Sequence, residues 1–237
     1  MPEPAVIHSI ERVIPEIVEQ FRRLSSATVY EASGGHGALS SRIKPIDPRM
    51  RVCGAAVTVK VRPGDNLMLH KAIYVAKAGD VIVADAQGFT EAGAWGEVMT
   101  VAAQARSIGG LVFNGAIRDT REISELGFPA FCAGVCIKGT EKVSLGPINH
   151  PLIMDNVLIN PGDLVVGDCD GVVIVRREDA EAVLQKTMDR EQKEARAMER
   201  LRAGESTLEL FGLAQILTQR KLSEEDVEVS KECGDRP

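Results

Sequence analysis

The stretch GLVFNGAIRDT, residues 110–120, decides the fold, because a mainly apolar run passes directly into charged residues. Apart from Asn114, residues 110–116 are apolar on both faces of an extended chain, which is typical of a parallel strand covered on two sides. Residues 120–127, TREISELG, predict a short helix immediately afterwards. The centre of the chain is therefore a strand–helix unit whose junction contains Arg118 and Asp119.

The same alternation extends on both sides of this unit. Upstream, residues 52–61 and 77–85 predict strands, and residues 96–109 predict a helix. Downstream, residues 129–135 predict another strand. Helices that alternate with continuous apolar strands indicate an α/β fold with parallel strands in its core.

Helices are also predicted at the N-terminal end, over residues 10–24 and within residues 25–35. Residues 160–175 predict a hairpin, because Asp170-Gly171 suits a tight turn between two apolar runs.

The C-terminal part is charged rather than apolar. Residues 178–204 combine helix-forming residues with a thin apolar stripe, which suits a helix that leaves the body of the domain. Residues 222–237 resemble a weakly held tail. No linker forces a second domain, so we predict a single domain over residues 1–237.

The composition argues against several classes of protein. The chain has 237 residues and a formal net charge of −6, with no basic cluster, which disfavours nucleic-acid binding. No window approaches the roughly 18 apolar residues of a membrane span, and no signal peptide is visible. The five cysteines are an odd number, which favours buried thiols over a disulfide framework. We expect a cytoplasmic protein.

Arg118, Asp119 and Glu122 follow the end of the central strand, where ligand sites of α/β sheets gather. Asp119 and Glu122 share one face of a helical first turn, and two such carboxylates can hold Mg²⁺, partly through water. Arg118 can bind a carboxylate or an oxyanion. Acids at a helix N-terminus also have a purely structural explanation in the helix dipole, and spacing alone does not choose between the two.

The stretch GFTEAGAWGEVMT, residues 88–100, is the second candidate. A helix that begins near Glu97 leaves the amides of Val98 and Met99 free for an anion. An ordinary capped helix after a glycine loop explains the same residues. If the two candidates are adjacent, they suggest a pocket for a small keto acid.

Two weaker patterns favour structural roles, and a third concerns a single histidine. Asp168-Cys169-Asp170-Gly171 begins like a calcium loop but lacks the later ligands, so we interpret it as a turn. Cys132 and Cys136 lack a second ligand pair at zinc spacing, which favours packing. His36, flanked by glycines, is the histidine that deserves suspicion as a functional residue.

Four segments together resemble the RraA-like family: TVYEASGGHGAL (28–39), GEVMT (96–100), GGLVFNGAIRDTREI (109–123) and NPGDLVVGDCDGVVIV (160–175). Within this family, the sequence is most similar to the 4-hydroxy-4-methyl-2-oxoglutarate/4-carboxy-4-hydroxy-2-oxoadipate aldolases. The resemblance implies a swivelling β/β/α fold, trimers or hexamers, and active sites between subunits. It also implies that the charged C-terminal helix packs across a subunit interface.

The resemblance assigns a metal site as well. Asp119 would ligate Mg²⁺ or Mn²⁺, Glu122 would hold metal-bound water, and Arg118 would bind substrate oxygens and stabilise charge. Glu194 is our choice for the glutamate that such proteins contribute from a neighbouring subunit. Two nearby glutamates stay open as alternatives: Glu191 and Glu199.

The substrate side of the implied site comes from three other segments. The amides of Val98 and Met99 would bind the pyruvate carboxylate, and Glu97 would complete that loop. Glu31 and Lys142 would line the same pocket.

The activity that the resemblance implies is a class II aldolase of aromatic-compound catabolism, which releases pyruvate from a small 2-oxo acid and has oxaloacetate decarboxylation as a side activity. No lysine stands out for a metal-free Schiff-base route. A dedicated oxaloacetate decarboxylase and a non-catalytic RraA-type ribonuclease regulator are the alternatives, since one fold serves all three. A methyltransferase is disfavoured, because no glycine-rich S-adenosylmethionine loop is visible.

Overall fold

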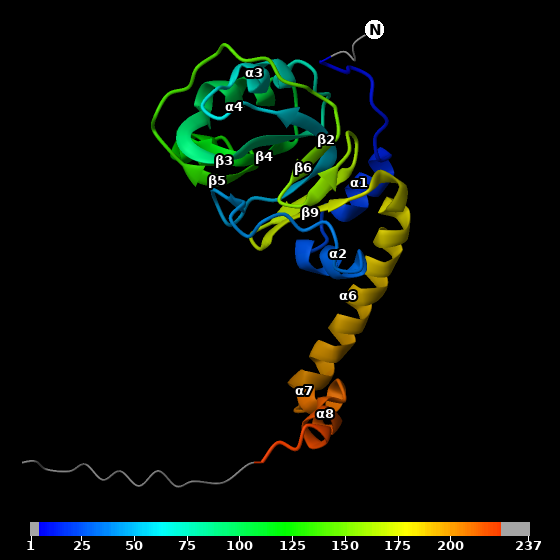
Figure 1. Ribbon diagram of the computed structural model, residues 1–237. Helices are drawn as coiled ribbons and strands as arrows, with labels where there is room; N and C mark the ends of the chain where they lie inside the picture. The colour runs from blue at the N-terminus through cyan, green and yellow to red at the C-terminus, as the bar shows by residue number, and fades with distance from the viewer. Residues whose placement is uncertain (1–4, 224–237) are drawn as a thin grey trace, which may run out of the picture. The chain divides into compact units, whose positions relative to one another are not determined.

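The computed structural model describes residues 5–223, and a seven-stranded mixed sheet forms its centre (Figure 1). The strand order is β1-β5-β4-β3-β2-β8-β9. Strands β2 to β5 are parallel, whereas β1, β8 and β9 pair antiparallel. Strands β6 and β7 form a separate hairpin. The bounds are β1 (Lys44–Pro45), β2 (Val52–Lys60), β3 (Val81–Trp95), β4 (Gly110–Ile117), β5 (Ala130–Val135), β6 (Leu152–Met154), β7 (Val157–Ile159), β8 (Leu164–Asp168) and β9 (Gly171–Val175).

Helices connect the parallel strands, which confirms the predicted α/β core. The first helix is shorter than the pattern over residues 10–24 predicts, because it begins at Pro15, whose ring cannot donate a helical hydrogen bond. The bounds are α1 (Pro15–Phe21), α2 (Ser26–Ala32), α3 (Leu67–Ile73), α4 (Glu97–Gln104), α5 (Thr120–Glu125), a 3-10 turn (Arg177–Asp179), α6 (Ala180–Arg202), α7 (Thr207–Leu210) and α8 (Leu213–Gln219).

Three apolar clusters hold these layers together. Helices α3, α4 and α5 cover one face of the parallel strands, where the buried rings of Trp95 and Phe128 stack with centroids 6.1 Å apart. The β6–β7 hairpin covers the other face. The third cluster packs α1, α2 and the first turns of α6 against β8 and β9. The two-sided burial of β4 explains why its sequence is apolar without alternation.

Two local predictions need correction. The segment from Gly88 to Gly93 is no loop: β3 continues through it to Trp95, with register shifts against β4 after Asp85. The β8–β9 hairpin is present, but its turn lies one residue earlier than predicted, because Asp168 pairs with Gly171.

The expectation of buried thiols holds only in part. Cys53 and Cys132 are buried, Cys136 is half-buried, and Cys169 is exposed. Burial raises the pKa of Cys53 to about 12, so its thiol stays protonated at neutral pH. Cys233 lies outside the described residues.

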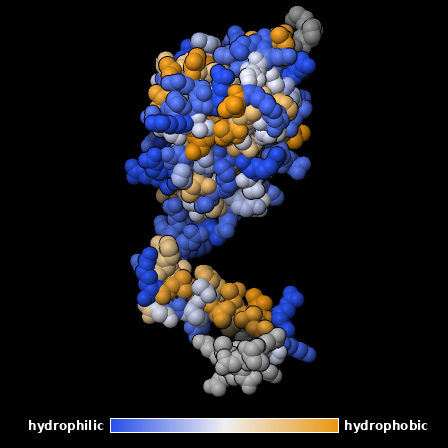
Figure 2. Space-filling model, turned by 90° about the vertical axis from the view of Figure 1, so that its left-hand side faces the viewer, coloured by the Kyte–Doolittle hydropathy of each residue, from blue (hydrophilic) through white to orange (hydrophobic). Residues whose placement is uncertain are grey.

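The chain separates into two compact units, Met1–Arg190 and a second unit from Glu191 onward. The second unit contains the end of α6 with α7 and α8, and Figure 2 shows hydrophobic surface gathered on it. Its exposed apolar side chains include Leu208, Phe211 and Ile216. None of the helices over residues 5–223 is long and apolar enough to cross a membrane. The predicted tail over residues 222–237 lies almost entirely outside the described residues.

Candidate functional site

A pocket of about 310 Å³ lies where β3 and β4 end, beside the N-terminus of α4. It brings together four of the predicted residues, Val98, Met99, Arg118 and Asp119, with Lys142 as a fifth. Lys142 lies 44 positions after Val98 in the sequence. The position agrees with the rule that α/β sheets bind ligands beyond the carboxyl ends of their strands.

Asp119 has an unusual backbone and an unusual partner. It occupies the N-cap position of α5 with φ +57° and ψ +39°, a left-handed conformation that aspartate tolerates better than most residues. Its carboxylate does not cap α5. Instead, Oδ2 accepts a hydrogen bond of 3.1 Å from the backbone N–H of Glu97, the first residue of α4. The left-handed turn thus directs the carboxylate across the pocket to another helix.

Arg118 lies beside this carboxylate. Its Nε is 3.6 Å from Asp119 Oδ2, and both side chains are more than one-third exposed. Its backbone N–H donates to the carbonyl of Trp95 at 2.8 Å, which joins the ends of β3 and β4. The guanidinium is therefore positioned but open to a ligand, so the two charges do not simply neutralise each other.

Gly96 allows this close approach. A Cβ at Gly96 would collide with Asp119 Oδ2 and would lie 3.2 Å from Cγ of Arg118. Its φ of −152° is ordinary extended backbone, so space rather than backbone strain requires glycine. The first turn of α4 follows, and the amides of Val98 and Met99 have no carbonyl four residues earlier inside the helix. These amides offer a binding site for an anion.

The far wall comes from residues that sequence reasoning missed. Buried Asp65 accepts hydrogen bonds from the amides of Leu67, Val143 and Ser144 at 2.8 to 2.9 Å, which fixes the segment that carries Lys142. Burial alone would raise the Asp65 pKa, but these amide bonds hold it below its ordinary value. In the sequence, Arg62-Pro63-Gly64-Asp65 indicates only a turn and points to no distant partner.

Asn66 and His70 also line the pocket. Asn66 is 6% exposed and donates its amide N–H to the carbonyl of Ala94, whereas its Oδ1 is buried and has no partner. An orphaned buried acceptor on a residue that lines a pocket indicates a ligand or an ordered water. Burial, and secondarily the charge of Lys142, lowers the pKa of His70, which favours a neutral imidazole.

The other predicted residues lie outside the lining of this pocket in the described chain. Glu31 lies on α2 and pairs with Arg190, so the structure does not bring it to the pocket within one subunit. Glu122 lies in the first turn of α5, and the exposed Glu97 contributes its backbone N–H. Glu194 lies on α6 in the second unit. His36 is exposed and lines a different pocket.

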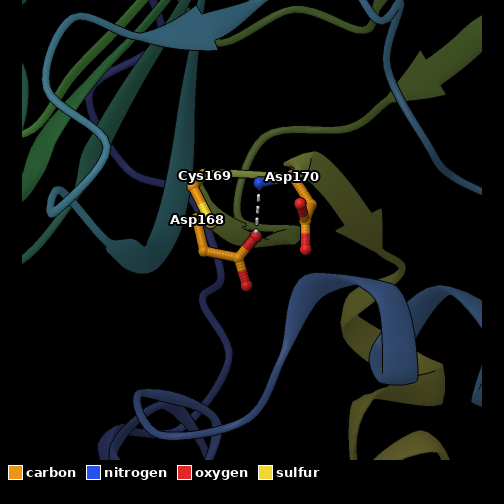
Figure 3. Close-up of side chains that lie close together, drawn as sticks. All are labelled: Asp168, Cys169 and Asp170. Atoms are coloured by element: carbon orange, nitrogen blue, oxygen red, sulfur yellow. Dashed lines mark hydrogen bonds between the residues drawn. The ribbon is translucent and has the colours of Figure 1, made fainter.

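The β8–β9 turn contains the one group of three His, Cys, Asp or Glu side chains with metal-compatible spacing among the described residues: Asp168, Cys169 and Asp170 (Figure 3). Both oxygens of Asp168 are already bonded within the protein. Oδ2 accepts from the Ser26 amide at 2.9 Å, and Oδ1 accepts from the Ser26 hydroxyl at 2.6 Å and the Asp170 amide at 3.1 Å. This supports the interpretation as a structural turn.

Comparisons with known proteins agree on one family. A family model described as Aldolase/RraA, RraA-like, matches residues 18–174. A protein of Halalkalibacterium halodurans, provisionally named 4-hydroxy-4-methyl-2-oxoglutarate aldolase, is 42% identical over 171 residues, which cover 72% of this chain and 81% of the relative.

Two solved structures share the fold. A protein of Pseudomonas syringae pv. tomato is similar with a TM-score of 0.75 and 29% identity, covering 85% of this chain and 98% of the other. Streptomyces coelicolor RraAS2, titled an unusual member of the RNase ES inhibitor RraA protein family, has a TM-score of 0.72 and 29% identity, covering 80% and 99%.

Proposed function

This chain belongs to the RraA-like family, and from that premise we propose that it is a divalent-metal-dependent aldolase that releases pyruvate from 4-hydroxy-4-methyl-2-oxoglutarate, 4-carboxy-4-hydroxy-2-oxoadipate or both. The single observation that carries the proposal is the hydrogen bond from Glu97 to Asp119 beside Arg118. It places a carboxylate, a guanidinium and a helix N-terminus in one pocket. Those are the groups that a 2-oxo acid needs for binding and for charge stabilisation.

The oxygen donors present fit Mg²⁺ or Mn²⁺. Asp119 uses Oδ2 for the Glu97 amide, while its Oδ1 makes no hydrogen bond among the described residues. Asn66, whose Oδ1 has no hydrogen-bond partner, lines the same pocket, and such hard cations prefer oxygen ligands and retain several waters. We assign Asp119 as the direct ligand and Glu122 as the holder of metal-bound water. When bound, the metal supplies Lewis acidity toward the keto oxygen.

The chain's own residues bind and orient the substrate. The amides of Val98 and Met99 receive the carboxylate next to the keto group, where the dipole of α4 favours negative charge. Cleavage of the carbon–carbon bond leaves negative charge on the pyruvyl oxygen, and the Arg118 guanidinium stabilises it. Lys142, which also lines the pocket, suits the second carboxylate of a dicarboxylic substrate. The same charge stabilisation supports oxaloacetate decarboxylation as a side activity.

We also propose that the protein works as a trimer or hexamer. The second unit exposes large apolar side chains, among them Phe211 at 59% exposure, which suits a surface covered in an assembly. In such an assembly, the C-terminal helix of a neighbouring subunit would supply Glu194 to the site.

The test is pyruvate release from 4-hydroxy-4-methyl-2-oxoglutarate by the full chain, with Mg²⁺, with Mn²⁺ and with a chelator. We expect activity with either metal and its loss on chelation. Arg118→Gln should abolish most of the activity, whereas Arg121→Gln, an exposed control on α5 that pairs with Glu125, should not. Activity that survives chelation would overturn the metal assignment.

The similarity to RraAS2 supports a second candidate, a regulator of a ribonuclease assembly. Recovery of an RNA-degrading enzyme with the purified chain, together with no lyase activity on any 2-oxo acid, would favour it. A main role in oxaloacetate decarboxylation is decided by comparing kcat/KM for oxaloacetate with kcat/KM for the aldol substrates.

A further inference from the structure

A second pocket, of about 530 Å³, lies on the other face of the parallel strands, under the β6–β7 hairpin. Its polar lining consists mainly of Arg42, Lys60, Asp85, Asn114 and Asp155. None of these residues belongs to the proposed aldolase site. The volume falls in the usual range for small-molecule sites, about 300 to 1,000 Å³.

Three of these side chains form a row across neighbouring parallel strands. Lys60 of β2 is in register with Asp85 of β3, and Asp85 is in register with Asn114 of β4. Residues in register point to the same face of a sheet. Val83 and Val112 stand two residues before Asp85 and Asn114 and therefore point to the same face. Both valines pack in the cluster under the β6–β7 hairpin, so the row lies on the face that the hairpin covers. The row lies at the carboxyl end of β2, and it lies where the pairing of β3 with β4 first shifts register. Ligands of α/β sheets typically bind at such strand ends.

The bottom of this pocket has acceptors without donors. Asp85 and Asn114 are 7% and 4% exposed. Asp85 Oδ1 accepts from the Asn114 amide group and from the Gln87 backbone N–H, both at 2.8 Å. That bond fixes the orientation of Asn114 and leaves its Oδ1 buried without a partner. Oδ2 of Asp155 is buried and unpartnered as well. An acceptor that is buried without a partner destabilises the fold, and a ligand with hydrogen-bond donors would remove that cost.

The rim has the opposite charge. Arg42 donates to Asp155 Oδ1 at 3.3 Å. Lys60 is exposed and makes no ion pair with any residue in 5–223. Gly88, with φ +71°, provides the space between rim and bottom, because a Cβ there would lie 3.2 Å from Arg42 Nη1 and 3.6 Å from Asn114 Oδ1. A side chain at Gly88 would therefore crowd both Arg42 and Asn114.

We propose that this pocket binds a small zwitterion, namely a free α-amino acid. Its ammonium group donates to Asn114 Oδ1 and to the Asp85 carboxylate, and its carboxylate pairs with Lys60 and Arg42. A bare metal ion would satisfy the acceptors but would meet the two rim cations. A hydroxy acid would offer no ammonium group to the carboxylate of Asp85. A zwitterion matches both parts of the pocket, because its ammonium group meets the buried acceptors and its carboxylate meets the rim cations.

The pocket also has a direct connection to the first one through the backbone. Asn114 precedes Arg118 by four residues on the same strand and its continuation, and β3 passes from Asp85 to Gly93 and Ala94 of the aldolase pocket. A ligand bound in the second pocket would therefore contact β3 and β4, the two strands that position the aldolase pocket.

The experiment is calorimetric titration of the full chain with glycine, L-alanine, L-serine and L-aspartate, and in parallel with lactate and with Mg²⁺. We expect at least one amino acid to bind. Lys60→Met and Asn114→Leu should each weaken that binding by about 10-fold or more, the loss of a hydrogen bond to a charged group. Lys77→Met, an exposed lysine in the loop before β3, and Arg118→Gln should leave it unchanged.

Binding that is lost in Arg118→Gln but kept in Lys60→Met would place the ligand in the aldolase pocket and overturn the proposal. The proposal would also be overturned if lactate but no amino acid bound, if this pocket bound Mg²⁺ and no amino acid, or if none of the four amino acids bound. Because Lys60 is exposed, Lys60→Met tests the proposal even if Asn114→Leu fails to fold. Amide shifts of Gln87 and Gly88 in labelled protein, with those of Val98 and Met99 unmoved, would give the same answer without any activity assay.

Discussion

The carboxylate of Asp119 accepts its hydrogen bond from the backbone N–H of Glu97, 22 residues earlier in the chain, rather than from its own helix. An aspartate at a helix N-cap ordinarily binds the amides of the following turn. Here the left-handed backbone of Asp119 turns the side chain toward the start of α4. The Asp119 side chain therefore does not stabilise the N-terminus of α5, and its carboxylate faces the pocket instead.

Asp119→Asn separates the charge of this side chain from its geometry. Asparagine also tolerates the left-handed conformation and keeps an oxygen for the Glu97 amide, so we expect an unchanged thermal midpoint. Metal-stimulated pyruvate release should fall to the level seen with a chelator. Asp119→Ala should lose the same activity and should also be destabilised, by about 1 to 2 kcal/mol of backbone strain. Near-normal metal-stimulated turnover by Asp119→Asn would remove Asp119 from the site.

Gly96→Ala tests the close approach of α4 to Arg118 and Asp119. The backbone at Gly96 accommodates alanine, but the new methyl group displaces the Asp119 carboxylate and crowds Arg118. We expect kcat to fall by about 100- to 1,000-fold, the usual effect of removing one charge-stabilising group, while the fold persists. Steady-state kinetics and circular dichroism measure the two effects. Val101→Ala, at an exposed position of the same helix, is the control and should keep normal kinetics.

The sequence predicted the part of this site that depends on local order. The apolar run of residues 110–117 predicts a buried strand, and Arg118 and Asp119 must then follow its end. The pattern of residues 96–109 likewise predicts a helix, and α4 begins there at Glu97. Parallel strands bring such ends to one edge, so the two segments meet in the pocket.

The rest of the pocket depends on contacts between residues that are distant in the sequence. A local role already accounts for each of these residues, so nothing in the sequence points to the distant contact. Asp65 in Pro-Gly-Asp is explained by a turn, yet its carboxylate binds the amides of Val143 and Ser144. Glu31 lies in a glycine-rich segment that resembles the family, but its partner in this chain is Arg190. The continuation of β3 to Trp95 uses bulged pairing with β4, which no residue preference in a glycine-rich segment indicates.

Asp65→Asn should change how stability depends on pH. The pKa of Asp65 is below its ordinary value of about 3.9 in the folded state, so the folded protein binds fewer protons than the unfolded chain between these two values. The stabilisation is therefore complete above the unfolded pKa and is lost as the pH falls through the folded pKa. We expect the wild-type advantage over Asp65→Asn to shrink below about pH 4.

Urea unfolding of both proteins from pH 3 to pH 7 measures this difference, because other carboxylates titrate equally in both. Asp65→Asn should also raise KM for the aldol substrate, since the segment that carries Lys142 loses its anchor. A constant stability difference across this pH range would contradict the assignment of the shift to Asp65.

Asp168→Asn tests whether the β8–β9 turn is a structural or a metal site. Burial alone would raise the pKa of Asp168, but its bonds to Ser26 and to the Asp170 amide, with the charge of Arg51, hold the pKa below its ordinary value, so it is ionised at neutral pH. Asparagine keeps one acceptor oxygen but places an NH2 group against either the amide or the hydroxyl of Ser26, so we expect destabilisation by about 1 to 3 kcal/mol. Asp170→Asn in the same turn is the matched control, because the Asp170 carboxylate makes no bond among the described residues and its change should be nearly neutral.

Calcium distinguishes the two interpretations in the same samples. A ligand that binds only the folded state raises its stability in proportion to the logarithm of ligand concentration. Since both oxygens of Asp168 are already bonded within the protein, millimolar Ca²⁺ should leave the thermal midpoint of the wild type unchanged. A Ca²⁺-dependent rise of that midpoint that disappears in both Asp168→Asn and Asp170→Asn would show instead that the turn binds a metal ion.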